Sequence, residues 1–158
     1  MHVSLVEKSD CPQILAFIRL KAAFDEQMRG SPSGVSITLE KIEKALFGDN
    51  PLAHAILLKN EKEAVGFAFY HTRFSSFSGS PSIWLDDLFV HSAQRSNGGG
   101  LKMINALQQE AIKLGASHIS WTVSIANNQG KKFYNRIGAQ VERTDKTLTY
   151  YRLPIRAN

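Results

Sequence analysis

The sequence predicts an α/β fold in which about four helices flank a mixed, largely antiparallel sheet of about six to seven strands. Three observations lead to this prediction. The chain has 158 residues, which is the length of one domain. Strand-like and helix-like segments succeed one another from end to end, and no internal repeat or linker divides them. We therefore expect residues 1–158 to form a single domain.

The first half of the chain predicts one strand, two helices and then three strands. Alternating apolar residues predict the first strand at about 3–8. Ser9-Asp10-Cys11-Pro12 offers capping side chains and a first-turn proline, which predicts a helix that ends before the glycines, serines and proline of 30–34. Thr38 caps a second helix that runs to Phe47. The strands expected after it span 53–58, 64–73 and 83–91, with a mobile hairpin loop at 74–82.

The second half predicts a helix, a strand, a helix and a closing pair of strands. Glycines at 98–100 precede a helix from about Leu101 to Leu114, and Gly115 ends it. The segments expected after it are a strand at 117–124, a short helix at 127–137, and strands at 139–143 and 148–153.

Composition excludes several classes of protein. Hydrophobic residues make up 43% and charged residues 21% of the chain, which excludes a disordered or collagen-like protein. The single cysteine, Cys11, excludes an intramolecular disulfide, and the five histidines lack ligand spacing, so we expect no metal site. The net charge of +5 suits a plain solvated surface, nucleic acid, anionic lipid or a small phosphorylated ligand. Without an apolar run of about 20 residues or the apolar core of a signal peptide, we expect a cytoplasmic protein with no membrane partner.

The most informative segment is the strand-to-helix turn Arg95-Ser96-Asn97-Gly98-Gly99-Gly100. Unpaired amides at a helix N-terminus, where the helix dipole is positive, can bind phosphate. A flexible turn is the plain alternative. Two nucleotide-binding motifs fail here, because Leu101-Lys102-Met103 replaces the Lys-Ser/Thr of the Walker pattern and Met103 replaces the third glycine of the dinucleotide fingerprint.

Two motifs resemble the GNAT superfamily of N-acetyltransferases. Residues 95–100 match its Arg/Gln-x-x-Gly-x-Gly/Ala signature. Residues 127–139 resemble its Asn-x-x-Ala-x-x-Phe-Tyr-x-x-x-Gly-Phe segment, with Gly130 in place of Ala and Ala139 in place of Phe. The order of predicted elements is also similar, so the resemblance implies the GNAT fold. Within the superfamily, Val65-Gly66-Phe67-Ala68-Phe69-Tyr70 and Trp84-Leu85-Asp86-Asp87-Leu88-Phe89-Val90 look like strands of diamine (spermidine/spermine) acetyltransferases.

The resemblance implies a binding site for acetyl-CoA as co-substrate. The backbone of one strand would hold the acetyl and pantetheine arm, the amides that follow it would cradle the pyrophosphate, and Arg95 would add charge. Asn127 would bond the pantetheine arm, and Lys131 or Lys132 would meet the nucleotide phosphates. The cofactor-binding residues so implied are Leu88, Phe89, Val90, Arg95, Ser96, Asn97, Gly98, Gly99, Gly100, Leu101, Asn127 and Lys131.

The resemblance also implies the catalytic residues. When an amine attacks a thioester, an oxyanion forms and a thiolate leaves, and Tyr134 would be the general acid that protonates the sulfur. Asp86 stands where the family has a catalytic Glu, one methylene longer, which favours proton transfer through water. Strand alternation places Asp87 on the opposite face as a neighbouring or fold-supporting charge. The substrate-binding residues so implied are Asp25, Glu26, Trp84, Asp86 and Asp87, with a solvated helix face as the alternative for Asp25 and Glu26.

The expected activity is acetyl transfer to the primary amine of a small cationic substrate, by direct attack in a ternary complex. The 74–81 segment lacks the acid and the tryptophan that diamine acetyltransferases carry there, so a shorter amine or a lysine-like amino acid fits as well as a polyamine. A peptide or protein amine acetyltransferase and a non-catalytic CoA-binding sensor are the alternatives. A nucleic-acid-binding module comes last, because no helix-turn-helix signature is present. The resemblance further implies a homodimer that pairs through the C-terminal strands.

Overall fold

The computed structural model describes residues 1–30, 34–61 and 63–155. One seven-stranded sheet runs through them in the order β1-β2-β3-β4-β5-β7-β6, and only the β4–β5 pair is parallel. The mixed α/β fold that the sequence predicts is therefore confirmed. The strands are β1 His2–Leu5, β2 His54–Asn60, β3 Glu63–Ser75, β4 Ser80–Val90, β5 His118–Ser124, β6 Gln140–Thr144 and β7 Leu148–Pro154. The helices are α1 Cys11–Arg29, α2 Leu39–Phe47, α3 Gly99–Lys113 and α4 Asn128–Arg136.

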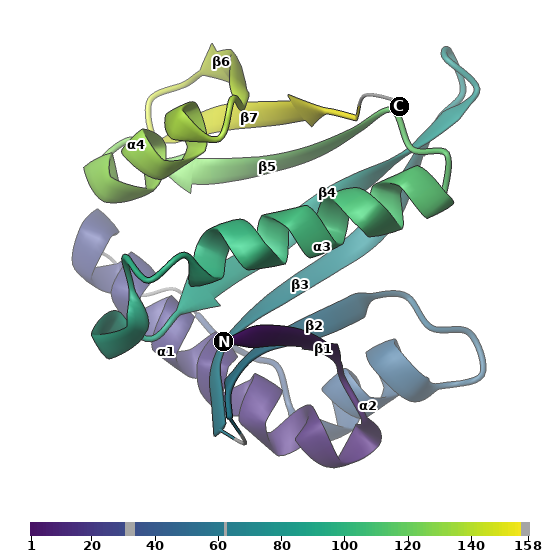
Figure 1. The fold of residues 1–158 in the computed structure, drawn as a ribbon, viewed down its shortest axis with the longest axis vertical. Coiled ribbons are helices and arrows are strands. Elements are labelled where there is room, and N and C mark those ends of the chain that lie inside the picture. Colours follow the sequence, from purple (N-terminus) through teal and green to yellow (C-terminus); the bar gives the residue numbers. More distant parts are fainter. Residues whose placement is uncertain (31–33, 62, 156–158) are drawn as a thin grey trace.

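The helices cover the two faces of the sheet unequally (Figure 1). On one face, α3 packs Met103, Ile104 and Leu107 against a core that extends from β2 to β7. On the other face, α1 and α2 pack Phe17 and Ile42 against β2, β3 and β4. Within the described residues, that second core contains nothing from β5, β6 or β7. The C-terminal strands are therefore covered on one face, whereas the first four strands lie between two layers.

Local capping explains where the helices begin and end. The Thr38 side chain accepts a hydrogen bond from the Lys41 amide at 3.3 Å, so α2 starts where the sequence predicts. Gly30 ends α1 with a φ of +68°, a left-handed conformation that favours glycine. The predicted break at 30–34 continues into Ser31–Ser33, which lie outside the described residues.

Two predicted boundaries are wrong. The first strand ends at Leu5 because a 3₁₀ turn follows at Lys8–Asp10, in which the Glu7 amide donates to Asp10 at 2.9 Å. The predicted loop at 74–82 is shorter, because the β3–β4 ladder continues through Phe74↔Pro81 to Ser75↔Ser80. Pairing with a neighbouring strand outweighs the turn preference of serine and proline at those positions.

Candidate active site

Strands β4 and β5 separate after a short paired stretch. Their register joins only Ile83 to Ile119 and Trp84 to Ser120, and Figure 1 shows them diverging beyond that point. The other edge of β4 stays paired with β3 as far as Val90. In the described sheet, the β5-facing edge of 85–90 therefore presents backbone N–H and C=O groups that no strand uses. We call the space between this edge and β5 the wedge, and Leu88, Phe89 and Val90 lie along it.

A β-bulge places both acidic residues of β4 on one face of the sheet. The register pairs Phe69 with Asp87 and Tyr70 with Leu85, which leaves Asp86 as the extra residue. A bulge turns two successive side chains to the same side. Asp86 Oδ1 accepts a hydrogen bond from Trp84 Nε1 at 3.4 Å, and Asp87 faces α1. The prediction that Asp87 points to the opposite face is therefore wrong, because strict alternation does not hold across a bulge.

Asp87 belongs to a half-buried charge cluster with two residues of α1. Lys21 Nζ lies 2.5 Å from an Asp25 oxygen and 3.6 Å from Asp87 Oδ1. Arg29 also pairs with Asp25, at 3.3 Å. Burial raises the pKa of the Asp87 carboxyl above its usual range, Lys21 opposes that shift, and the carboxylates of Asp86 and Asp25 add to it. Two cations thus balance Asp25, whereas Asp86 is exposed and accepts from an indole N–H.

Tyr134 lies on the other side of the wedge, held by aromatic neighbours. Its ring centroid lies 4.9 Å from that of Trp121 in β5 and 5.4 Å from that of Tyr151 in β7. Burial raises the pKa of the Tyr134 phenol above its usual value, and Tyr151, Asp25 and Asp87 act in the same direction. The carboxylates of α1 and β4 are thus near enough to influence the phenol. Tyr134 therefore stays protonated at neutral pH, as a proton donor must.

The glycine turn brings unpaired amides to the N-terminus of α3. Gly98 is the cap residue with a φ of +78°, and Ser96 has a φ of +67°, which is strained for a residue other than glycine. From Ser96 to Leu101, no backbone amide has an acceptor among the described residues, and the first such bond of the helix is from Lys102 to the Gly98 carbonyl at 3.0 Å. These donors, together with the helix dipole, fit a phosphate group.

Close packing explains why residues 99 and 100 are both glycine. A Cβ on Gly99 would lie 2.4 Å from Leu58 Cδ2, and one on Gly100 would lie 3.1 Å from Phe133 Cζ. Glycine at both positions lets α3 approach β2 and α4 closely. The triple glycine therefore combines one conformational requirement with two close contacts.

The cations near this turn are held by the protein. Arg95 Nε donates to the Val90 carbonyl at 2.9 Å, and its guanidinium lies 4.9 Å from the centroid of the Phe24 ring. Lys102 Nζ donates to the Met1 carbonyl at 3.0 Å. Arg95 is thus fixed against the end of β4 and α1, so its charge is close to the turn without pointing freely into solvent.

The comparison with known families agrees with this geometry. The acetyltransferase (GNAT) family model matches residues 19–139. The chain belongs to the GNAT acetyltransferase family. It is accordingly an acyltransferase, and acetyl-CoA is the co-substrate of the family.

Relatives of this GNAT chain act on small amines, to judge from their names. The thialysine N-epsilon-acetyltransferase of Mus musculus is 28% identical over 141 residues, which cover 84% of this chain and 80% of the relative. The L-ornithine N5-acetyltransferase NATA1 of Arabidopsis thaliana is 29% identical over 82 residues, 52% of this chain and 36% of the relative. The solved structure of a tetramutant of BH1408 from Bacillus halodurans superposes with a TM-score of 0.80 at 15% identity, over 92% of this chain and 97% of that one, and shows the shared fold.

The GNAT segment at 127–139 begins with Asn127, whose side chain is hydrogen-bonded within the chain. Asn127 Oδ1 accepts from the Gly130 amide at 2.8 Å and so caps α4. A Cβ on Gly130 would lie 2.8 Å from Asn127 Nδ2, so glycine in place of the family's alanine lets the asparagine side chain fold back on the helix. Its Nδ2 group is a further hydrogen-bond donor at the start of α4.

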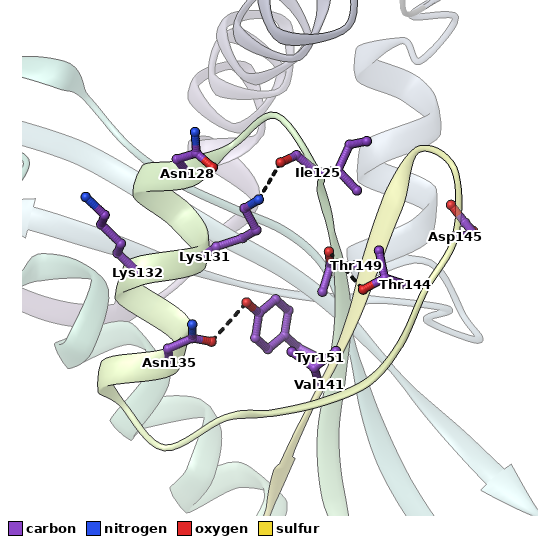
Figure 2. A pocket seen from close by; sticks show the side chains of 10 residues that line it. All are labelled: Ile125, Asn128, Lys131, Lys132, Asn135, Val141, Thr144, Asp145, Thr149 and Tyr151. Carbon is purple, nitrogen blue, oxygen red and sulfur yellow. Dashed lines mark hydrogen bonds between the residues drawn. The ribbon is translucent and has the colours of Figure 1, made fainter.

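Lys131 lines a separate pocket between α4 and the β6–β7 hairpin. Figure 2 shows its amine turned toward the Ile125 carbonyl, to which Nζ donates at 2.5 Å. In the same pocket, of about 780 Å³, the Tyr151 hydroxyl donates to Asn135 Oδ1 at 3.0 Å. Lys132, in contrast, is exposed and turned away from Lys131 (Figure 2).

Several residues that shape the site were missed by the sequence prediction. Lys21 is the counter-ion of Asp25 and Asp87, and its i,i+4 spacing to Asp25 on one helix was a usable signal. Tyr151 lies beside the Tyr134 ring together with Trp121, but it comes from a separate strand and gives no local signal. The predicted substrate residue Trp84 contacts Asp86 as described, and Glu26 is half-buried next to Asp25 on α1.

Neither a metal-ligand cluster nor a membrane-spanning helix occurs in the described part of the chain. In residues 1–30, 34–61 and 63–155, no three side chains of His, Cys, Asp or Glu gather as metal ligands would. None of the helices in the described part combines the length and the apolar character of a membrane crossing.

Proposed function

We propose that this chain transfers the acetyl group of acetyl-CoA to the primary amine of a small cationic substrate, by direct attack in a ternary complex. The substrate class comprises diamines, polyamines and lysine-like amino acids. The observation that supports this most is the wedge, which has an exposed carboxylate, Asp86, at the point where β4 and β5 part and a protonated phenol, Tyr134, on the opposite side. Relatives named for thialysine and L-ornithine support a small amine.

The acidic groups of β4 would bind the amine. An alkylamine is protonated at neutral pH and must lose a proton before its lone pair can attack. Asp86 is exposed, and among the described residues its side chain accepts a hydrogen bond only from the Trp84 indole, so it can attract the ammonium group and accept its proton through a water molecule. Asp87 and Asp25 would add a negative field from α1 and β4, moderated by Lys21.

The chemical step needs a proton at sulfur. The amine nitrogen attacks the thioester carbonyl, the C–N bond forms, and the C–S bond breaks. The ammonium group gives its first proton through water to Asp86, which passes it to solvent before the attack. The second proton, lost as the C–N bond forms, also goes to Asp86, and the leaving sulfur takes a proton from Tyr134. Bulk solvent then restores both groups. No acyl-enzyme is proposed, because direct attack by the amine needs no protein nucleophile.

The cofactor would lie along the wedge toward α3. The free edge of Leu88, Phe89 and Val90 would bind the pantetheine arm, with Asn127 Nδ2 opposite it. The amides from Ser96 to Leu101 would bind the pyrophosphate. The charges of Arg95 and Lys131 would favour the phosphates from a distance, because both side chains are bonded to carbonyls.

We also propose that residues 1–158 act as a single cytoplasmic domain that forms a homodimer through its C-terminal strands. The support is the edge strand β6, in which every residue is exposed and Val141 is 52% exposed. Light scattering after size exclusion would show a dimer, and Val141→Lys would convert it to monomer. A monomer at all concentrations would contradict this part of the proposal.

A thiol-release assay with acetyl-CoA and a panel of diamines, polyamines, lysine analogues and peptides tests the activity. We expect free CoA with small amines. Release with peptides alone would favour a peptide or protein acetyltransferase. Binding of CoA without release for any amine would indicate a non-catalytic sensor.

A further inference from the structure

A second pocket opens beside Asp86, on the face of the sheet that carries both acids of the bulge. Its volume is about 400 Å³, and it lies where β4 and β5 are still paired. Arg73, Trp84, Ser120, Arg143 and Tyr150 are among its walls. The indole of Trp84 connects this pocket to the proposed amine site, because its N–H donates to Asp86 Oδ1 at 3.4 Å.

Two guanidinium groups in this pocket lack a carboxylate partner. The Cζ atom of Arg73 lies 5.0 Å from the Trp84 ring centroid, and that of Arg143 lies 3.6 Å from the Tyr150 ring centroid. Within the described residues, neither forms an ion pair, and the acid of the pocket, Glu142, already pairs with Arg152 at 3.2 Å. Stacking on a ring leaves the N–H edges of a guanidinium available to a planar anion.

Opposite charges therefore flank one indole. Asp86 contacts the N–H edge of Trp84, and Arg73 lies over its ring. The 74–81 segment next to Arg73 contains no acidic residue. The far ammonium of a diamine or polyamine would meet two positive charges here, whereas a carboxylate would meet two guanidinium groups, each of which can form bidentate bonds.

We propose that Arg73 and Arg143 form a carboxylate subsite, so that the preferred acceptor is an amino acid whose side-chain amine reaches Asp86. This inference rests on the proposed function and narrows it from small cationic amines in general to zwitterionic ones. The two arginines determine specificity, and they take no part in proton transfer.

Matched acceptors test the preference. L-Lysine, L-lysinamide and cadaverine share the same amine and carbon chain, but only L-lysine carries a carboxylate. We expect kcat/KM for L-lysine to exceed that for the other two by about tenfold or more, mainly through a lower KM. Equal values, or a preference for cadaverine, would overturn the inference while leaving the acetyltransferase function intact.

Substitutions of Arg73 and Arg143 test whether these two side chains cause the preference for an acceptor with a carboxylate. Arg143→Gln and Arg73→Gln should each raise KM for L-lysine by about tenfold, leave kcat nearly unchanged, and leave KM for cadaverine unchanged or lower. Arg19→Gln, which removes the same charge from an exposed position on α1, is the matched control. An equal loss toward all three acceptors, or no loss toward L-lysine, would contradict a carboxylate subsite. Circular dichroism verifies that each variant is folded.

If no acceptor is acetylated, binding measured by calorimetry still tests the carboxylate subsite. That result would contradict the proposed function, but binding of L-lysine and cadaverine to the CoA-loaded protein can still be compared. Tighter binding of L-lysine that Arg143→Gln abolishes would support the subsite. Equal binding of the two compounds, or none, would overturn it.

Discussion

The two halves of the sheet differ in how they are covered and in what they carry. Strands β1 to β4 lie between α3 and the α1–α2 pair, and their inner faces are aromatic and aliphatic. Among the described residues, strands β5 and β7 contribute to a core on one face only, and on the other face they carry Ser120, Tyr150 and Arg152. The first half is therefore a scaffold. The proposed chemistry lies in the wedge, where β4 and β5 separate.

The strongest test of the scaffold is Phe67→Ala. Phe67 is fully buried in β3, and its ring stacks on Phe17 of α1 at 5.7 Å. The variant should lower the free energy of unfolding by about 3–5 kcal/mol, through lost burial and a cavity. Lys146→Ala, in the exposed turn between β6 and β7, should change it by about 0.5 kcal/mol or less. Urea unfolding measures both, and similar losses would remove the distinction between the halves.

Among substitutions in the wedge, we expect Tyr134→Phe to lower activity most. The variant keeps the ring contacts with Trp121 and Tyr151 but removes the proton donor. We expect kcat to fall by about 100-fold or more, with unchanged affinity for CoA. Steady-state kinetics and a CoA titration measure the two quantities. An unchanged kcat would exclude Tyr134 as the general acid.

We expect Asp86→Asn to lower catalytic activity less than Tyr134→Phe does. Because proton transfer through water is less effective than through a directly placed base, kcat/KM for cationic amines should fall by about tenfold. The remaining activity should rise steeply with pH toward the pKa of the amine, about 10, because the substrate must then arrive neutral. Asp49→Asn, in the exposed turn after α2, is the matched control. A pH profile identical to that of the unsubstituted protein would place the base elsewhere.

The smallest effect is a gain in stability from Asp87→Asn. Burial raises the folded-state pKa of Asp87, so the folded protein holds its proton to a higher pH than the unfolded chain does. The ionised carboxylate therefore lowers stability at neutral pH, and that loss is recovered as the pH falls through the folded-state pKa. We expect the variant to be more stable at pH 7 by about 1 kcal/mol or less, with the difference vanishing in acid. Thermal unfolding at several pH values would contradict this if the variant were less stable at pH 7.

Local signals in the sequence predicted much of the fold. The cap at Thr38, the proline after Cys11 and the glycine after α1 each act within one turn, so those helices could be placed to within a residue or two. The bulge at Asp86 could not be predicted, because it depends on the register of β4 against β3. Trp121, Tyr151 and the Arg73–Arg143 pair meet only through the strand order, which no local pattern reveals. The roles of Tyr134 and Asp86 stay predictions.

The most direct test of amine acetylation in the wedge is to follow both products of one reaction. Purified protein is mixed with acetyl-CoA and L-lysine, free thiol is followed with a chromogenic reagent, and the acceptor is then analysed by mass spectrometry. We predict one acetyl group on the amine for each CoA released, and no release without acceptor. Release of CoA without an acetylated amine, or tight CoA binding with no release for any small amine, would contradict the proposed function.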